Sequence, residues 1–156
     1  MFDEQGHIQR LLNYAYFFLK FRPRTKKEVN DYLNKKSKKY HFSQEIITEV
    51  IKQLEEESLV NDKSFISWFV DQRSRSKPKS RFILTSELLR LGAKKDQVDQ
   101  YFSEHEIDEY ALASLAAQRK LRSLTHLSFE KQKEKLTSFL LRRGFSFEII
   151  KQVIQK

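Results

Sequence analysis

An internal repeat of 51 to 52 residues is the feature that most restricts the fold of this chain. The segment FSQEIITEVI at 42–51 agrees with FSFEIIKQVI at 145–154 at seven of ten positions. Halfway between them, Leu88–Gly92 matches Leu140–Gly144 in spacing, which reveals a more diverged middle copy. A fixed period of this length indicates tandem structural units that stack on their neighbours.

A second signature has nearly the same period. An arginine pair with one residue between its members occurs at Arg22 and Arg24 and again at Arg73 and Arg75, 51 residues later. A less regular third copy spans 119–122. Because two unrelated signatures share one period, we predict three repeats, at residues 1–60, 61–106 and 107–156.

Composition and spacing make each repeat helical. The 156 residues include only 3 Gly and 2 Pro, whereas a chain of short strands needs turn residues about every ten positions. Apolar residues of the first repeat recur at helical spacing, and Thr25-x-x-Glu28 forms a capping-box motif. We therefore predict an all-α fold of three tandem three-helix repeats, packed end to end into an elongated, curved array.

Helix ends can also be assigned from individual residues. Ser43 should cap the third helix of the first repeat, and Gly92 and Gly144 should end helices in the left-handed conformation. We expect the side chains of Asn61 and Asp62 to accept hydrogen bonds from the first N–H groups of the next helix. The segment 37–41 is interpreted as an insertion that lengthens a basic loop.

Positive charge is concentrated in blocks. Thirty Lys and Arg against 21 Asp and Glu leave a net charge of +9; residues 20–39 contain nine bases and two acids, and residues 73–81 contain five bases and no acid. One or two cations at a helix end would stabilise the helix dipole by roughly 0.3–1 kcal/mol. The blocks contain more cations than the helix dipole requires, so we favour a polyanionic binding partner. Arginine can grip nucleic-acid phosphate or an acidic protein surface equally well.

Catalysis has no motif behind it. The four histidines are scattered without metal-ligand spacing, and no glycine-rich phosphate loop is present. We predict no catalytic residues, no metal site and no cofactor. The longest apolar run, 14–19, is far too short to cross a bilayer, and the absence of cysteine suits a reducing compartment. We expect a cytoplasmic protein without membrane contact.

Four sequence words occur in order from about residue 10 to 155, and together they resemble the RecX family. The words are Arg22-x-Arg24-Thr25-x-x-Glu28-Val29, Leu59-Val60-Asn61-Asp62-x-x-Phe65, Arg73-x-Arg75-Ser76 leading to Glu87-Leu88-x-x-x-Gly92, and Arg143-Gly144-Phe145-Ser146-x-x-x-Ile150. Departures fall in turns: Ser58 stands where the family often has Gly, and 78–80 replaces another common Gly.

The resemblance implies a small helical regulator of the bacterial RecA recombinase, acting in homologous recombination, DNA repair and the SOS response. Such a protein would lie as a monomer along the groove of the RecA filament on single-stranded DNA, and would hinder ATP hydrolysis and strand exchange. Double-stranded DNA is a further candidate partner. The residues expected to contact the filament or DNA are Arg22, Arg24, Lys26, Lys27, Arg73, Arg75, Lys77, Lys79, Arg81, Arg119, Lys120 and Arg122.

The sequence also allows an alternative function. Three-helix units with a basic helix often dock on DNA, so the chain could be a stand-alone DNA-binding protein of the helix-turn-helix type. That alternative predicts tight binding to duplex DNA without RecA. A steep dependence of binding on salt would indicate contacts to phosphate, whereas a purely protein partner need not give one.

Overall fold

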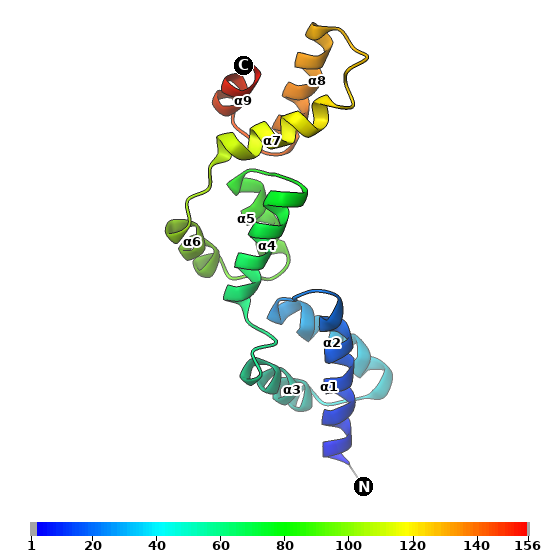
Figure 1. Ribbon diagram of the computed structural model, residues 1–156. Coiled ribbons are helices and arrows are strands. Elements are labelled where there is room, and N and C mark those ends of the chain that lie inside the picture. Colours follow the sequence, from blue (N-terminus) through cyan, green and yellow to red (C-terminus); the bar gives the residue numbers. More distant parts are fainter. Residues whose placement is uncertain (1–2, 156) are drawn as a thin grey trace. The chain divides into compact units, whose positions relative to one another are not determined.

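The computed structural model describes residues 3–155, and this part of the chain contains nine α-helices and no strand (Figure 1). The all-α prediction is confirmed, and the helices follow one another in groups of three. They are α1 (Glu4–Phe21), α2 (Lys26–Tyr40), α3 (Gln44–Glu56), α4 (Asp62–Ser76), α5 (Arg81–Arg90), α6 (Lys95–Glu104), α7 (Glu109–Leu121), α8 (Phe129–Arg142) and α9 (Phe147–Ile154).

Side-chain caps fix the starts of several helices, as the sequence predicts. The Thr25 hydroxyl accepts from the Glu28 N–H at 3.0 Å, and the Glu28 carboxylate accepts from the Thr25 N–H at 3.1 Å, so the capping box is complete. Ser43 accepts from the Ile46 N–H at 3.3 Å. Each such cap stabilises its helix by about 1 kcal/mol.

Left-handed residues lie at the same turn of every repeat. Gly92 has φ +103° and Gly144 has φ +89°, which confirms both predicted turns. The equivalent residue of the first repeat is His41, with φ 59°. His41 is exposed, so its Cβ has room beside it.

The segment 37–41 is not the predicted loop insertion. Helix α2 continues through Tyr40, and His41 ends it by donating its N–H to the Ser37 carbonyl. The Ser37 hydroxyl donates to the Phe42 carbonyl at 2.5 Å and is buried. The prediction was wrong because the side-chain hydrogen bond and the buried position of Ser37 stabilise an extra helical turn that polar composition alone did not indicate.

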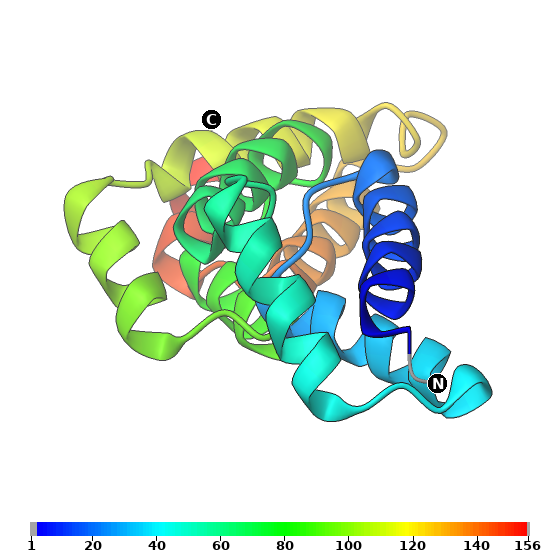
Figure 2. The ribbon, with the colours of Figure 1, turned by 90° about the horizontal axis from the view of Figure 1, so that it is seen from below.

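The chain divides into two compact units. Unit 1 comprises Met1–Trp68 and Leu89–Gln97, and unit 2 comprises Phe69–Leu88 and Val98–Lys156. In unit 1, helices α1, α2 and α3 pack on one another (Figure 2) around an apolar core that includes Leu11, Leu33, Ile47, Val50 and Leu54. In unit 2, helices α7, α8 and α9 pack around Ala113, Ala116, Leu140, Phe145 and Ile150.

Unit 1 contains a contact between the start of α2 and the next repeat, which we call the first joint. The buried Thr25 hydroxyl donates to the Leu91 carbonyl at 2.6 Å, just after α5 ends. Asp62, the first residue of α4, accepts from the Lys26 N–H at 2.9 Å. Asn61 accepts from the Ser64 N–H at 3.1 Å as predicted. Asp62 therefore departs from prediction, because it serves the free N–H of α2.

Unit 2 contains a second joint of the same design, between the start of α5 and the third repeat. The buried Ser80 lies immediately before α5 and donates its N–H to the Arg143 carbonyl at 3.0 Å. Glu109, the first residue of α7, accepts from the Arg81 N–H at 2.9 Å. In each joint, the acidic first residue of one repeat accepts a hydrogen bond from the first N–H of the second helix in the preceding repeat.

The two glycines are required by these joints. A Cβ on Gly92 would lie 2.4 Å from the Lys27 Cβ, and one on Gly144 would lie 2.3 Å from the Ser80 Oγ. No side chain fits at such distances without movement. Both the positive φ and the close approach of the neighbouring helix start therefore select glycine.

No helix within residues 3–155 is both long enough and apolar enough to cross a lipid bilayer.

Candidate nucleic-acid interface

The twelve cations proposed from the sequence lie at three equivalent turns, each at or after the end of a repeat's first helix. Four follow α1 in unit 1, five lie around the α4–α5 turn in unit 2, and three end α7 in unit 2. Their partners differ, and these partners decide which cations can bind a ligand.

Arg22 and Arg24 form contacts within the α1–α2 turn in which they lie. The Arg22 guanidinium grips both oxygens of Glu28, at 2.5 and 3.3 Å. Arg24 lies over the Phe18 ring at 4.0 Å and donates to the Phe18 carbonyl at 3.3 Å. Burial, and then the charge of Arg22, lower the pKa of Arg24. These arginines hold α1 against the start of α2.

The second repeat uses its first arginine in the same way. Arg73 donates to Glu87 of α5 at 3.3 Å and lies over the Phe69 ring at 4.9 Å. Lys79 pairs with the same carboxylate and is only 20% exposed. Arg75 is different, since it is 77% exposed and pairs with Asp71 one turn earlier on the helix surface. An exposed pair of this kind contributes little and can be exchanged for an external anion.

The third copy is divided between structural and exposed cations. Arg119 donates to the Ser76 carbonyl at 3.3 Å, and the Lys120 ammonium lies 5.4 Å from the centre of the Phe139 ring. Arg143 also lies over Phe139 and donates to the Pro78 carbonyl at 3.0 Å; burial, and then the charge of Arg119, lower its pKa. Arg122 is exposed.

Four further cations remain accessible from the predicted set. Lys26 and Lys27 are exposed and form only surface pairs, with Glu55 at 3.4 Å and Asp31 at 3.0 Å. Lys77 and Arg81 are exposed, with the Arg81 guanidinium 5.1 Å from the Phe102 ring centre. Together with Arg75 and Arg122, they are the predicted residues best placed to meet an anion.

A second group of cations, on α2, was not predicted from the sequence. We call them the α2 lysines: Lys35, Lys36, Lys38 and Lys39. None of the four forms an ion pair within residues 3–155. Their signal was visible as the end of the basic block at 20–39, but it was assigned to a loop and not to a helix surface.

Tyrosine rings lie among the α2 lysines. The Lys36 ammonium is 4.8 Å from the Tyr14 ring centre and 5.5 Å from that of Tyr32. Arg10 and Lys39 lie 5.3 and 5.5 Å from the Tyr40 ring centre. A hydrogen bond between the two hydroxyls raises the pKa of Tyr14 and lowers that of Tyr40. Unpaired cations beside aromatic rings are the combination that binds a single-stranded nucleic acid.

The described residues include no group of three or more His, Cys, Asp or Glu that could hold a metal ion. The histidines have local surroundings instead. His105 stacks on Tyr101 at 4.2 Å, and His7 lies 4.7 Å from Phe42.

Solved structures share this fold. The crystal structure of RecX from Lactobacillus salivarius matches 97% of this chain and 96% of its own, with a TM-score of 0.73 and 24% identity. Another structure, described as regulatory protein RecX, matches 96% of this chain and 73% of its own, with a TM-score of 0.72 and 17% identity. At these identities the likeness concerns the fold alone.

Sequence relatives and family models agree with one another. The Regulatory protein RecX of Bacillus cytotoxicus is 31% identical over 153 residues, covering 96% of this chain and 54% of the relative. The Regulatory protein RecX of Streptococcus uberis is 30% identical over 142 residues, covering 90% of this chain and 53% of the relative. The chain thus spans about half the length of the curated relatives it matches. Models of the first and third three-helix domains of RecX match residues 12–54 and 106–154. The chain belongs to the RecX family.

Proposed function

We propose that this chain binds the filament that the RecA recombinase forms on single-stranded DNA, and that it lowers the recombinase and ATPase activity of RecA. It acts in the cytoplasm as a monomer, in recombination and DNA repair, without a reaction of its own. The relatives are named Regulatory protein RecX, and that name supports the regulatory part of this proposal.

The observation that carries the DNA contact is the surface formed by the α2 lysines. These four cations lie within five consecutive residues, have no carboxylate partner in the described structure, and stand beside Tyr14 and Tyr40. Lysine ammonium groups bind backbone phosphate without regard to sequence, and tyrosine rings can stack on unpaired bases. Both properties suit a DNA strand held inside a protein filament.

The cations of the sequence-based set divide by their partners. We assign ligand contact to the exposed members Lys26, Lys27, Arg75, Lys77, Arg81 and Arg122. Arg22, Arg24 and Arg73 act through the turns that they hold together. Replacing these three should therefore affect binding mainly through stability.

The test measures ATP hydrolysis by RecA on single-stranded DNA in the presence of this protein. We expect hydrolysis to fall and filaments to shorten at stoichiometric protein. A variant with all four α2 lysines changed to Gln should inhibit at least about tenfold less well. The matched control changes Lys52, Lys63, Lys94 and Lys151, which are exposed elsewhere, to Gln, so that both variants lose the same charge.

Three results would contradict the proposal or a part of it. If the protein leaves RecA hydrolysis and filament length unchanged at stoichiometric amounts, the regulatory role is wrong for this chain. If it binds duplex DNA tightly without RecA and has no effect on the filament, the helix-turn-helix alternative is correct. Equal loss of inhibition in the two lysine variants would show that overall charge, and not the α2 surface, matters.

A further inference from the structure

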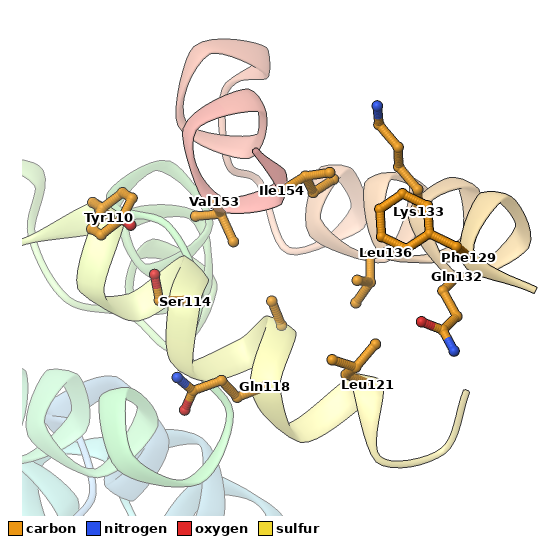
Figure 3. A pocket seen from close by; sticks show the side chains of 11 residues that line it. Tyr110, Ser114, Gln118, Leu121, Phe129, Gln132, Lys133, Leu136, Val153 and Ile154 are labelled. Atoms are coloured by element: carbon orange, nitrogen blue, oxygen red, sulfur yellow. The ribbon is translucent and has the colours of Figure 1, made fainter. Parts of the chain in front are cut away.

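The third repeat contains an apolar cavity that has no part in the proposed binding to the RecA filament. Its volume is about 380 Å³, and helices α7, α8 and α9 all contribute to its walls (Figure 3). The principal apolar residues around it are Ala117, Leu121, Phe129, Leu136, Val153 and Ile154. A cavity of this size falls in the range of sites that take a ligand or several side chains.

A small residue of α7 forms part of the cavity wall. Helix α7 presents Ala113, Ala116 and Ala117 to the interior of the third repeat. At the same distances from the first residue of α4, the chain has Ile66, Phe69 and Val70, all buried. Of the three alanines, Ala117 lines the cavity, and its side chain is two carbon atoms smaller than that of Val70.

The edge of the cavity is apolar and held in place. Phe129 is 77% exposed although its ring lines the cavity, and Leu121 is 38% exposed. The Gln132 amide donates to the carbonyls of Leu124 and Leu127, both at 3.1 Å, which fixes the loop that precedes α8. An exposed phenylalanine on a fixed edge is an anchor available to a partner.

The charged side chain that lines the cavity is basic. Among the described residues, Lys133 lines the cavity and no Asp or Glu does. Figure 3 shows the Lys133 chain directed away from the apolar side chains. At the end of α7, Arg122 follows Leu121 and is exposed. An acidic partner therefore complements this face.

We propose that this cavity is the docking groove for an acidic amphipathic helix of a partner protein. Leucine or phenylalanine side chains at positions i, i+4 and i+7 of that helix enter the space bounded by Leu121, Leu136 and Ile154. Its Glu or Asp residues face Lys133 and Arg122. This site is separate in sequence and chemistry from the α2 lysines, and it does not depend on the RecA role.

The test uses a fluorescein-labelled helical peptide of about 15 residues, with leucines at i, i+4 and i+7 and glutamates on its other faces. A second peptide carries lysine in place of every glutamate. Fluorescence anisotropy with the full chain should give at least about tenfold tighter binding for the acidic peptide. Phe129→Ser should weaken that binding by about tenfold, and Ala117→Leu, which fills the cavity, should abolish it.

Charge reversal gives a check that does not touch the core. Lys133→Glu should weaken the acidic peptide and strengthen the lysine peptide, which loss of folding cannot produce. Phe147→Ser is the matched control, because Phe147 is 70% exposed on α9 but does not line the cavity. Circular dichroism tests whether Ala117→Leu folds. If that variant does not fold, the peptide affinities of Phe129→Ser and Lys133→Glu still test the proposal.

Several outcomes would overturn the proposal. One is failure of the acidic peptide to bind, and another is equal binding of the two peptides. A third is binding that Phe129→Ser and Lys133→Glu leave unchanged. Sedimentation that reveals a dimer lost in Phe129→Ser would show that a second copy of the chain occupies the groove instead.

Discussion

Replacing Gly144 with alanine should destabilise the protein by about 2–5 kcal/mol. Two costs combine at this position. A φ of +89° costs an L-residue about 1–2 kcal/mol, and the new Cβ would lie 2.3 Å from both the Ser80 Oγ and the Ile83 Cγ1. Relieving such overlap costs a further ~1–3 kcal/mol. For a chain of this size the melting temperature should fall by roughly 5–15 °C.

His41→Gly is the matched control, since it changes the equivalent turn of the first repeat. His41 has φ 59° and is exposed, so glycine removes backbone strain but adds freedom to the unfolded chain, at a cost of about 0.5–1 kcal/mol. These effects nearly cancel, and stability should change by less than about 0.5 kcal/mol.

The assay is urea unfolding followed by far-UV circular dichroism, with thermal melts of the same samples. A loss below about 0.5 kcal/mol for Gly144→Ala would refute the reasoning, because the joint would then tolerate a side chain where the structure leaves no room. An equal loss for His41→Gly would show that any change at a left-handed turn, and not the joint, causes the effect.

Three further results are expected. Thr25→Val removes a helix cap and a hydrogen bond to the Leu91 carbonyl, so urea unfolding should show a stability loss of about 2 kcal/mol. Ser43→Ala removes only a cap and should cost about half as much. Equal stability losses in the two variants would contradict this reasoning. Changing the four α2 lysines to Gln should reduce the slope of log K against log salt for single-stranded DNA by about 3, and an unchanged slope in filter binding would exclude phosphate contact. Glu28→Gln leaves Arg22 and Arg24 without their carboxylate, so melting should occur a few degrees lower while DNA affinity in low salt stays the same or rises.

Local features of the fold could be predicted because their causes lie within a few residues. The capping box at Thr25 needs only Glu28 three positions later, and a left-handed turn needs only a glycine such as Gly92. The second joint could not be predicted, because Glu109 serves the N–H of Arg81 from 28 positions away. Hydrogen bonds between distant segments leave no local pattern in one sequence.

The candidate site was predicted less well than the fold, for a related reason. Charge density marked the basic stretches of the chain, but not which of their cations lack an ion pair. Arg22 and Arg73 count as positive charges in the sequence, yet each has a carboxylate on the following helix, Glu28 or Glu87. The α2 lysines were overlooked because their segment was assigned to a loop, where no common surface is expected.

What repeats in this chain is therefore best explained by architecture. The arginine that recurs after 51 residues at Arg22 and Arg73 holds a helix turn together in both places, and the recurring glycine makes room for a joint. Residues that occur in only one repeat have no such structural role. The α2 lysines occur at 35–39, whereas the equivalent segments 86–90 and 138–142 contain no lysine. Likewise, Ala117, which lines the cavity on α7, stands at the position that Val70 occupies on α4. Where three copies share one structural requirement, a residue found in only one copy is the better guide to binding, and both proposed surfaces lie at such residues.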